Sequence, residues 1–228
     1  WRVMADNLVE ELLFPTPIWW TELDVDNEAI ASFCYSVRDK SKGMSRSNVG
    51  GFQSPDFDGE DMLDADHALG DLARRIKALG EDIHARFKPW GCNVRLANIW
   101  LNINNSDSGD YNVTHTHPGS VLSGVYYVKT PPDSGDLLFH RDHTSAFLFA
   151  SAGVMQSSCE GGEDTPWCWS QMAYPPVAGR LMFFPAWLPH GVEAGKNVED
   201  RISVSFNLTP QIENETAYFG EVAKHYGM

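Results

Sequence analysis

The sequence predicts a mainly β fold, a sandwich or jelly-roll barrel, with helices before it. After Pro89, short runs of β-branched and aromatic residues alternate with turn-rich segments, a cadence typical of such barrels. Helical periodicity is confined to the first ninety residues. The 228 residues are 43% hydrophobic, which is enough for one sizeable core. We therefore expect one domain, 1–228, with a helical buttress at 1–90, a barrel at 91–212 and a C-terminal tail at 213–228.

Helices and one strand are expected in the first part of the chain. Residues 7–14 predict a short amphipathic helix or turn, and the aromatic run at 15–23 predicts a strand. Residues 26–43 have an acidic start, late basic residues and a glycine stop, which indicate a helix. The clearest helix is 66–87, because its apolar residues recur on one face. The intervening segment 45–59 is rich in Gly, Ser and Asp and is long enough to cover a site.

The expected strands of the barrel follow in order. Each is a short apolar or aromatic run bounded by turn residues. They lie at 97–104, 121–130, 135–140, 145–150, 180–187, 190–194 and 201–209.

Charge and cysteine content narrow the classes of partner. Lys and Arg number 17 against 31 Asp and Glu, and the net charge is −14. Such a surface repels phosphate backbones, and the basic residues are scattered, so we expect no nucleic-acid partner. No apolar run approaches the roughly 20 residues of a membrane span, and we expect a cytoplasmic protein. The four cysteines form no CxxC motif and indicate reduced thiols, although a Cys159–Cys168 pair stays open.

Three histidines and one arginine carry the chemical signal. His115 and His117 stand one residue apart at a strand end, so they project to the same side. Imidazoles facing the interior of a barrel need water, a hydrogen-bond partner or a metal. His190 follows another apolar strand. Farther on, Arg201 opens a strand on which it shares a face with Ser203 and Ser205, and this face resembles an anion site.

The order of these motifs resembles the iron(II)/2-oxoglutarate-dependent oxygenases, most of all the prolyl-hydroxylase-like branch and its uncharacterised members. The motifs are the histidine pair, the Tyr-Tyr strand, Phe-Phe-Pro, a distal histidine and Arg-x-Ser, within residues 95–210. The resemblance implies a double-stranded β-helix of the jelly-roll, cupin-like kind. It implies a hydroxylase that takes Fe(II), 2-oxoglutarate, O2 and a small-molecule or peptidyl substrate and releases succinate and CO2. A homodimer stays open.

The resemblance also implies roles for individual residues. The three histidines would hold the iron, with no catalytic side chain beyond them: His115, His117 and His190. A second group would bind the far carboxylate of 2-oxoglutarate: Arg201, Ser203 and Tyr127. The chain departs from the pattern at His117, where most relatives have aspartate. Three neutral imidazoles leave the iron one charge unit more positive, and Asp110 or Asp142 as a further ligand stays open.

Three alternatives remain at this point. A literal His-x-Asp occurs at His140–Asp142, but two more strands would then have to come from the turn-rich residues 141–178. A three-histidine iron dioxygenase could work without 2-oxoglutarate, with Arg201 holding a substrate carboxylate. A non-catalytic cupin-like module could hold structural zinc, which requires a closed four-ligand site rather than three histidines.

Overall fold

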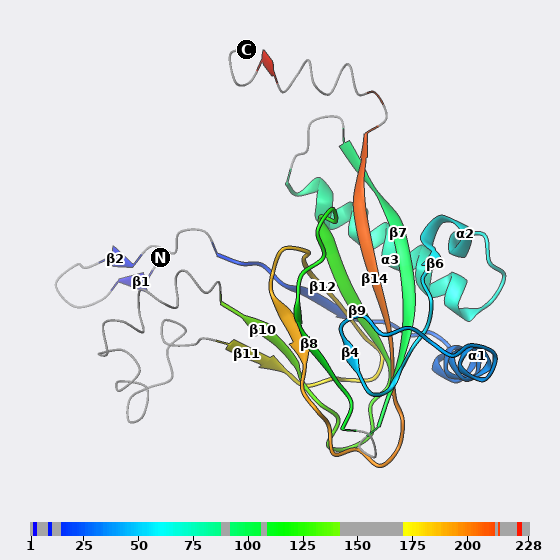
Figure 1. Ribbon diagram of the computed structural model, residues 1–228. Helices are drawn as coiled ribbons and strands as arrows, with labels where there is room; N and C mark the ends of the chain where they lie inside the picture. The colour runs from blue at the N-terminus through cyan, green and yellow to red at the C-terminus, as the bar shows by residue number, and fades with distance from the viewer. Residues whose placement is uncertain are drawn as a thin grey trace.

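Two antiparallel sheets face each other in the computed structural model (Figure 1). The structure describes residues 15–87, 92–105, 109–141, 171–212 and 214, with two short strands near the N-terminus and residues 223–224. The strands are β1 (Arg2–Val3), β2 (Val9–Glu10), β3 (Trp19–Glu22), β4 (Asn48–Val49), β5 (Phe52–Gln53), β6 (Phe57–Asp58), β7 (Cys92–Asn104), β8 (Tyr111–His115), β9 (Leu122–Lys129), β10 (Leu137–His140), β11 (Gln171–Tyr174), β12 (Arg180–Pro185), β13 (His190–Val192) and β14 (Arg201–Ile212). The helices are α1 (Asn27–Lys40), α2 (Gly59–Leu63) and α3 (Ala68–Ala85).

The order of the strands gives a jelly roll. The larger sheet runs β3-β12-β9-β14-β7-β5, with β6 also paired to β7. The smaller sheet runs β11-β10-β13-β8-β4. From β7 to β14 the chain changes sheet at every step except between β10 and β11, and the expected barrel fold is confirmed.

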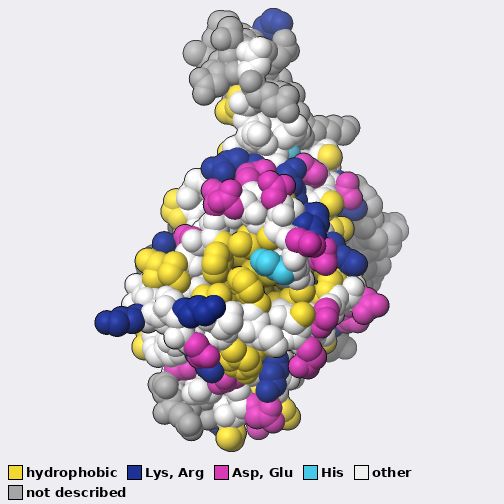
Figure 2. All heavy atoms as spheres, turned by 90° about the vertical axis from the view of Figure 1, so that its right-hand side faces the viewer, with side chains coloured by type: hydrophobic (Ala, Val, Ile, Leu, Met, Phe, Trp, Pro, Cys, Tyr) yellow, Lys and Arg dark blue, Asp and Glu magenta, His cyan; other side chains and the backbone are white. Residues whose placement is uncertain are grey.

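The helices cover the outer face of the larger sheet (Figure 1). Asp26 caps α1 by accepting a hydrogen bond of 2.9 Å from the backbone nitrogen of Ala29. The apolar stripe of α3 is buried, including Leu69, Leu72 and Ile76. Figure 2 views this helical side and shows acidic and basic side chains interspersed around a hydrophobic centre. This face therefore presents no continuous basic patch of the kind that nucleic acids require.

Strand alternation divides the apolar side chains between two cores. Tyr126 belongs to the core between the helices and the larger sheet, while Tyr127 points between the two sheets. The core between the sheets is small and is formed by Val125, Tyr127, Leu137, Phe139, Met182, Phe184 and Leu188. Because this core is small, it leaves room at one end of the barrel for a cavity.

Most of the expected elements are present. The helices at 26–43 and 66–87 and the strand at 15–23 are confirmed by α1, α3 and β3. The barrel strands are confirmed except for 145–150, which lies outside the described residues. The helix or turn expected at 7–14 is wrong at Val9–Glu10, which pairs as a strand with Arg2–Val3.

Two further elements differ from the expectation. Segment 45–59, expected as a loop, contains β4, β5 and β6, which extend both sheets. Strand β11 was not expected. Its pattern of exposed and half-buried residues carries no apolar run, and its pairing with β10 holds it in place.

Two general findings concern the membrane and the thiols. In the described part of the chain, no helix is long and apolar enough to cross a membrane. Cys34 and Cys92 are free thiols, and burial raises the pKa of Cys34 to about 12. Cys34 is therefore a packing residue rather than a nucleophile. Cys159 and Cys168 lie outside the described residues.

Candidate metal centre and anion site

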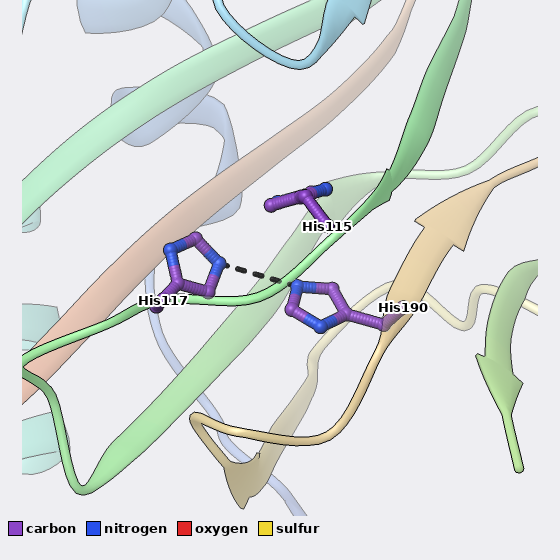
Figure 3. A group of neighbouring side chains, drawn as sticks. All are labelled: His115, His117 and His190. Carbon is purple, nitrogen blue, oxygen red and sulfur yellow. Dashed lines mark hydrogen bonds between the residues drawn. The ribbon is translucent and has the colours of Figure 1, made fainter. Parts of the chain in front are cut away.

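Three histidines from two strands and one turn converge at one end of the barrel (Figure 3). His115 ends β8, and His190 begins β13 directly opposite it in the register of the sheet. His117 lies two residues beyond β8, where its backbone nitrogen donates to Ala186 O at 2.9 Å. One ring nitrogen from each histidine lies within 4.8 Å of the other two. The three histidines come together as expected. Strand alternation explains the direction of the His115 side chain only, because His117 lies beyond the end of β8.

Backbone carbonyls orient two of the three rings. His115 Nδ1 lies 2.7 Å from Val113 O, and His190 Nδ1 lies 2.8 Å from Leu188 O. A carbonyl oxygen can only accept, so each Nδ1 carries the proton and each Nε2 keeps its lone pair. This is the arrangement by which proteins present histidine to a metal.

The surroundings keep these rings uncharged near neutral pH. Burial, followed by the nearby His115, lowers the pKa of His117 to about 4. The same two causes lower the pKa of His190 to about 3. Burial also lowers the pKa of His115. A metal ion needs neutral imidazole nitrogens, so the donor set suits a divalent cation.

A buried guanidinium lies at the other end of the same cavity. Arg201 is 3% exposed and its Nη1 donates to Ser203 Oγ at 3.2 Å. The guanidinium carbon lies 5.2 Å from the centre of the Tyr127 ring. Within the described residues, Arg201 Nε and the Tyr127 hydroxyl are buried and have no hydrogen bond of good geometry, although the two side chains lie close enough to affect each other's pKa.

These buried polar groups have the chemistry of a site for an anion. In the described part of the chain, no carboxylate lies within ion-pair distance of Arg201. A buried charge and buried donors without partners are costly unless a ligand completes them. Burial lowers the pKa of Arg201 and raises that of Tyr127. The site therefore fits a carboxylate held by a guanidinium and hydroxyl groups.

One open cavity is lined by both the histidines and Arg201 and therefore joins the two groups. The apolar part of the lining comes from Val125, Leu137, Phe184 and Val192. The polar part beyond the histidines and the arginine comes from Ser47, Trp100, Asn102, Asn112, Ser203 and Ser205.

Some of the alternative ligands lie elsewhere. His140 is not part of the convergent group, and its Nε2 lies 3.1 Å from Thr114 Oγ1. Asp110 is buried at the start of β8, where its Oδ2 accepts from the backbone nitrogen of Asn105 at 2.9 Å. It is not in the group of possible ligands within the described residues. Asp142 lies outside the described residues.

Sequence reasoning missed several residues of the cavity. Trp100 and Asn102 lie opposite Ser205 and Ser203 in the ladder between β7 and β14. Alternation along 97–104 would have placed these two side chains on one face, but only the pairing shows which face is interior. Asn112 and Ser47 are joined by a hydrogen bond of 3.3 Å between segments far apart in the sequence.

Similar folds occur among known oxygenases. The structure resembles a prolyl-4-hydroxylase from Pseudomonas putida at TM-score 0.57 and 15% identity, covering 85% of this chain and 92% of that one. It resembles HygX from Streptomyces hygroscopicus, solved with nickel and 2-oxoglutarate, at TM-score 0.52 and 14% identity, covering 88% and 85%. A prolyl hydroxylase from Trichoplax adhaerens, in complex with a hypoxia inducible factor peptide, matches at TM-score 0.52 and 11% identity, covering 89% and 86%. At these identities the likeness concerns the fold.

A family model matches the barrel segment of the sequence. No curated protein matches the chain. Residues 98–207, just under half of the chain, match the family described as "Putative 2OG-Fe(II) oxygenase", and this segment contains all three histidines and Arg201. With the jelly-roll fold, the match identifies the chain as a 2-oxoglutarate-dependent dioxygenase of the iron(II)/2-oxoglutarate oxygenase superfamily, with Fe(II) and 2-oxoglutarate as its cofactor and cosubstrate.

Proposed function

We propose that this dioxygenase is a hydroxylase, which inserts one atom of O2 into a C–H bond of its substrate. The other atom enters succinate as 2-oxoglutarate loses CO2. The observation that carries the proposal is that one cavity is lined by a histidine triad and by a buried Arg201, which has no carboxylate within ion-pair distance among the described residues. A metal ion and a dicarboxylate would fill the two ends of that cavity together.

In this proposal the three histidines hold iron(II). His115 and His190 present their Nε2 lone pairs because backbone carbonyls hold the Nδ1 protons. His117 supplies the third nitrogen. A set of three protein ligands leaves positions open, as catalytic sites require, and this favours an enzyme over a closed structural zinc site.

The far carboxylate of 2-oxoglutarate pairs with Arg201 in the same proposal. Arg201 and Ser203 share a face of β14, and Tyr127 is the register partner of Ser203 on β9. The three side chains offer a guanidinium and two hydroxyl groups to one anion. Arg201 Nε and the Tyr127 hydroxyl then gain an acceptor.

The side chains of this protein position the bound groups and exclude water from the space between them. When bound, iron(II) together with 2-oxoglutarate supplies the activation of O2. The apolar wall that includes Leu137 and Phe184 keeps bulk water from the space between the histidines and Arg201. The substrate, a small molecule or a peptidyl side chain, would occupy the rest of the cavity, which Trp100 and Asn112 help to line. We place the enzyme in the cytoplasm, in keeping with the free thiols of Cys34 and Cys92.

An anaerobic titration tests the proposal. Iron(II) and 2-oxoglutarate are added to the wild-type protein, and the visible charge-transfer band of the chelate is recorded. We expect a band with one iron and one 2-oxoglutarate per chain, followed by succinate formation when O2 is admitted. If the protein binds one iron per chain but shows no charge-transfer band with 2-oxoglutarate, the proposed 2-oxoglutarate site is wrong. A band without any hydroxylated product across a substrate screen would instead point to another oxidation by the same dioxygenase.

A further inference from the structure

The three histidines differ in how their rings are held. His115 and His190 each donate from Nδ1 to a backbone carbonyl two residues earlier. In the described part of the chain, His117 has no such bond at Nδ1. Its one ring-nitrogen contact is the 3.2 Å approach of its Nε2 to His190 Nε2 (Figure 3). Something other than a carbonyl must therefore orient this ring.

The ring of His117 lies against three other rings. Two belong to the neighbouring histidines, with centroids 4.9 Å away for His115 and 5.1 Å for His190. The third is the indole of Trp100, whose centroid lies 5.7 Å away at an interplanar angle of 45°. Among the described residues, Trp100 is thus the aromatic neighbour of His117 that is not itself a candidate metal ligand.

The backbone of Trp100 is held rigidly in the larger sheet. It lies in β7, which is paired with β14 on one side and with β5 and β6 on the other. Its partner in the ladder with β14 is Ser205, and the next residue, Leu101, is fully buried. A side chain anchored in the middle of a sheet moves little, so its indole face can restrict the rotation of a neighbouring imidazole.

We propose that Trp100 is the positioning residue of the third histidine, and that its indole holds the His117 ring where backbone carbonyls hold the rings of His115 and His190. The proposal rests on the assignment of these histidines as iron ligands. It explains how the His117 ring can keep one orientation without a carbonyl partner at Nδ1: the indole, tilted by 45°, limits the rotation of the imidazole from one side. A shorter carboxylate at this position would not need the indole.

A double-mutant cycle tests this role. Trp100→Leu removes the flat face and retains an apolar side chain, and Trp100→Phe restores a ring. Trp20→Leu is the matched control, because Trp20 is 57% exposed and stacks on Arg180 at 4.5 Å, on edge strand β3. We expect Trp100→Leu to weaken iron(II) binding about 10-fold and to shift the charge-transfer band, in line with the loss of an outer-shell partner. Trp100→Phe should recover most of the affinity, and Trp20→Leu should change neither quantity.

The second arm of the cycle uses His117→Asp. In that background Trp100→Leu should change the iron affinity less than 2-fold, because the indole no longer orients the ligand. An equal loss in both backgrounds, or no loss in either, overturns the role of Trp100. A wild-type protein that binds no iron would contradict the proposed function instead.

A spectroscopic measurement covers the case in which His117→Asp does not bind iron. In the zinc-loaded protein, the ring nitrogens of the three histidines give separate NMR signals. We expect Trp100→Leu to shift those of His117 and to leave those of His115 and His190 in place. Shifts of all three, or of none, contradict a specific action of Trp100 on His117.

Discussion

His115 and His190 are directly opposed residues of the antiparallel strands β8 and β13, and their ring centroids lie 4.5 Å apart. Direct opposition across a ladder is the closest approach that two side chains on one face of a sheet can have. Both rings also have their Nδ1 held by a backbone carbonyl. This pair is therefore the rigid half of the proposed metal site, and His117 completes it from a turn.

The first prediction concerns the rigid pair. Replacing His115 or His190 by Ala should abolish stoichiometric iron binding, because the remaining two nitrogens cannot define a three-ligand face. His140→Ala is the matched control, since His140 contacts Thr114 and lies outside the convergent group. Iron content after anaerobic loading checks this. Retention of iron in His115→Ala and His190→Ala with its loss in His140→Ala would overturn the ligand assignment.

The second prediction concerns the anion end of the cavity. Arg201→Met should raise the KM for 2-oxoglutarate about 10- to 100-fold, because a charge-assisted pair is worth about 1.5–3 kcal/mol. Iron affinity measured without 2-oxoglutarate should stay the same. Arg74→Met on the exposed side of α3 removes an equal charge far from this group and should leave KM unchanged. An unchanged KM in Arg201→Met, with succinate still formed, would show that 2-oxoglutarate binds elsewhere.

Wherever a regular strand carries candidate residues, the sequence predicts correctly which of their side chains share a face. Alternation along 201–209 correctly groups Arg201, Ser203 and Ser205 on one face, because this segment is a regular strand in the centre of a sheet. Features that depend on pairing between distant segments could not be predicted in this way. The contact of Trp100 with His117 is one case, since β7 and the turn after β8 meet only because the two sheets pack face to face.

The position of His117 also depends on a contact between distant segments, which the sequence pattern does not show. Alternation at a strand end was expected to turn His117 to the same side as His115, but β8 ends at His115 and His117 lies in the connection beyond it. Its place is set by the hydrogen bond from its backbone nitrogen to Ala186 O, on the connection between β12 and β13. The expected outcome, convergence, is right, while the physical reason for it is a long-range contact that periodicity does not contain.

The third prediction concerns the packing under the cavity. Gly124 on β9 has no room for a side chain, since a Cβ there would lie 2.2 Å from Phe206 Cζ and 2.3 Å from Met182 O. Gly124→Ala should therefore lower the free energy of unfolding by about 3 kcal/mol, at the upper end of typical overpacking costs. Gly119→Asn is the control, because Gly119 has open space and a φ of 86° that Asn tolerates best. Chemical denaturation measures both, and equal stabilities of the two variants would contradict the close packing around Gly124.

The fourth prediction concerns the pH dependence of the metal-free protein. The pKa of His117 is lowered to about 4 and that of His190 to about 3, while an unfolded histidine keeps its ordinary value of about 6.5. Between these limits the unfolded chain binds more protons than the folded one, so stability rises with pH over that window and levels off above it. Acidification from pH 7 to pH 4 should therefore destabilise the metal-free protein through these two groups.

Carboxylates also take up protons in this pH range and affect stability. The contribution of the two histidines is therefore measured as the difference between the wild type and a variant that lacks them. The thermal midpoint of the wild type, freed of metal with a chelator, is followed from pH 7.5 to pH 4 beside that of a His117→Gln/His190→Gln variant. Since glutamine takes up no proton, the variant should lose less stability on acidification, and the two curves should diverge only below about pH 6.5. Parallel curves across the whole range would mean that the two histidines are protonated as readily in the folded protein as in the unfolded chain. The cavity would then be far wetter than the burial of His190 requires.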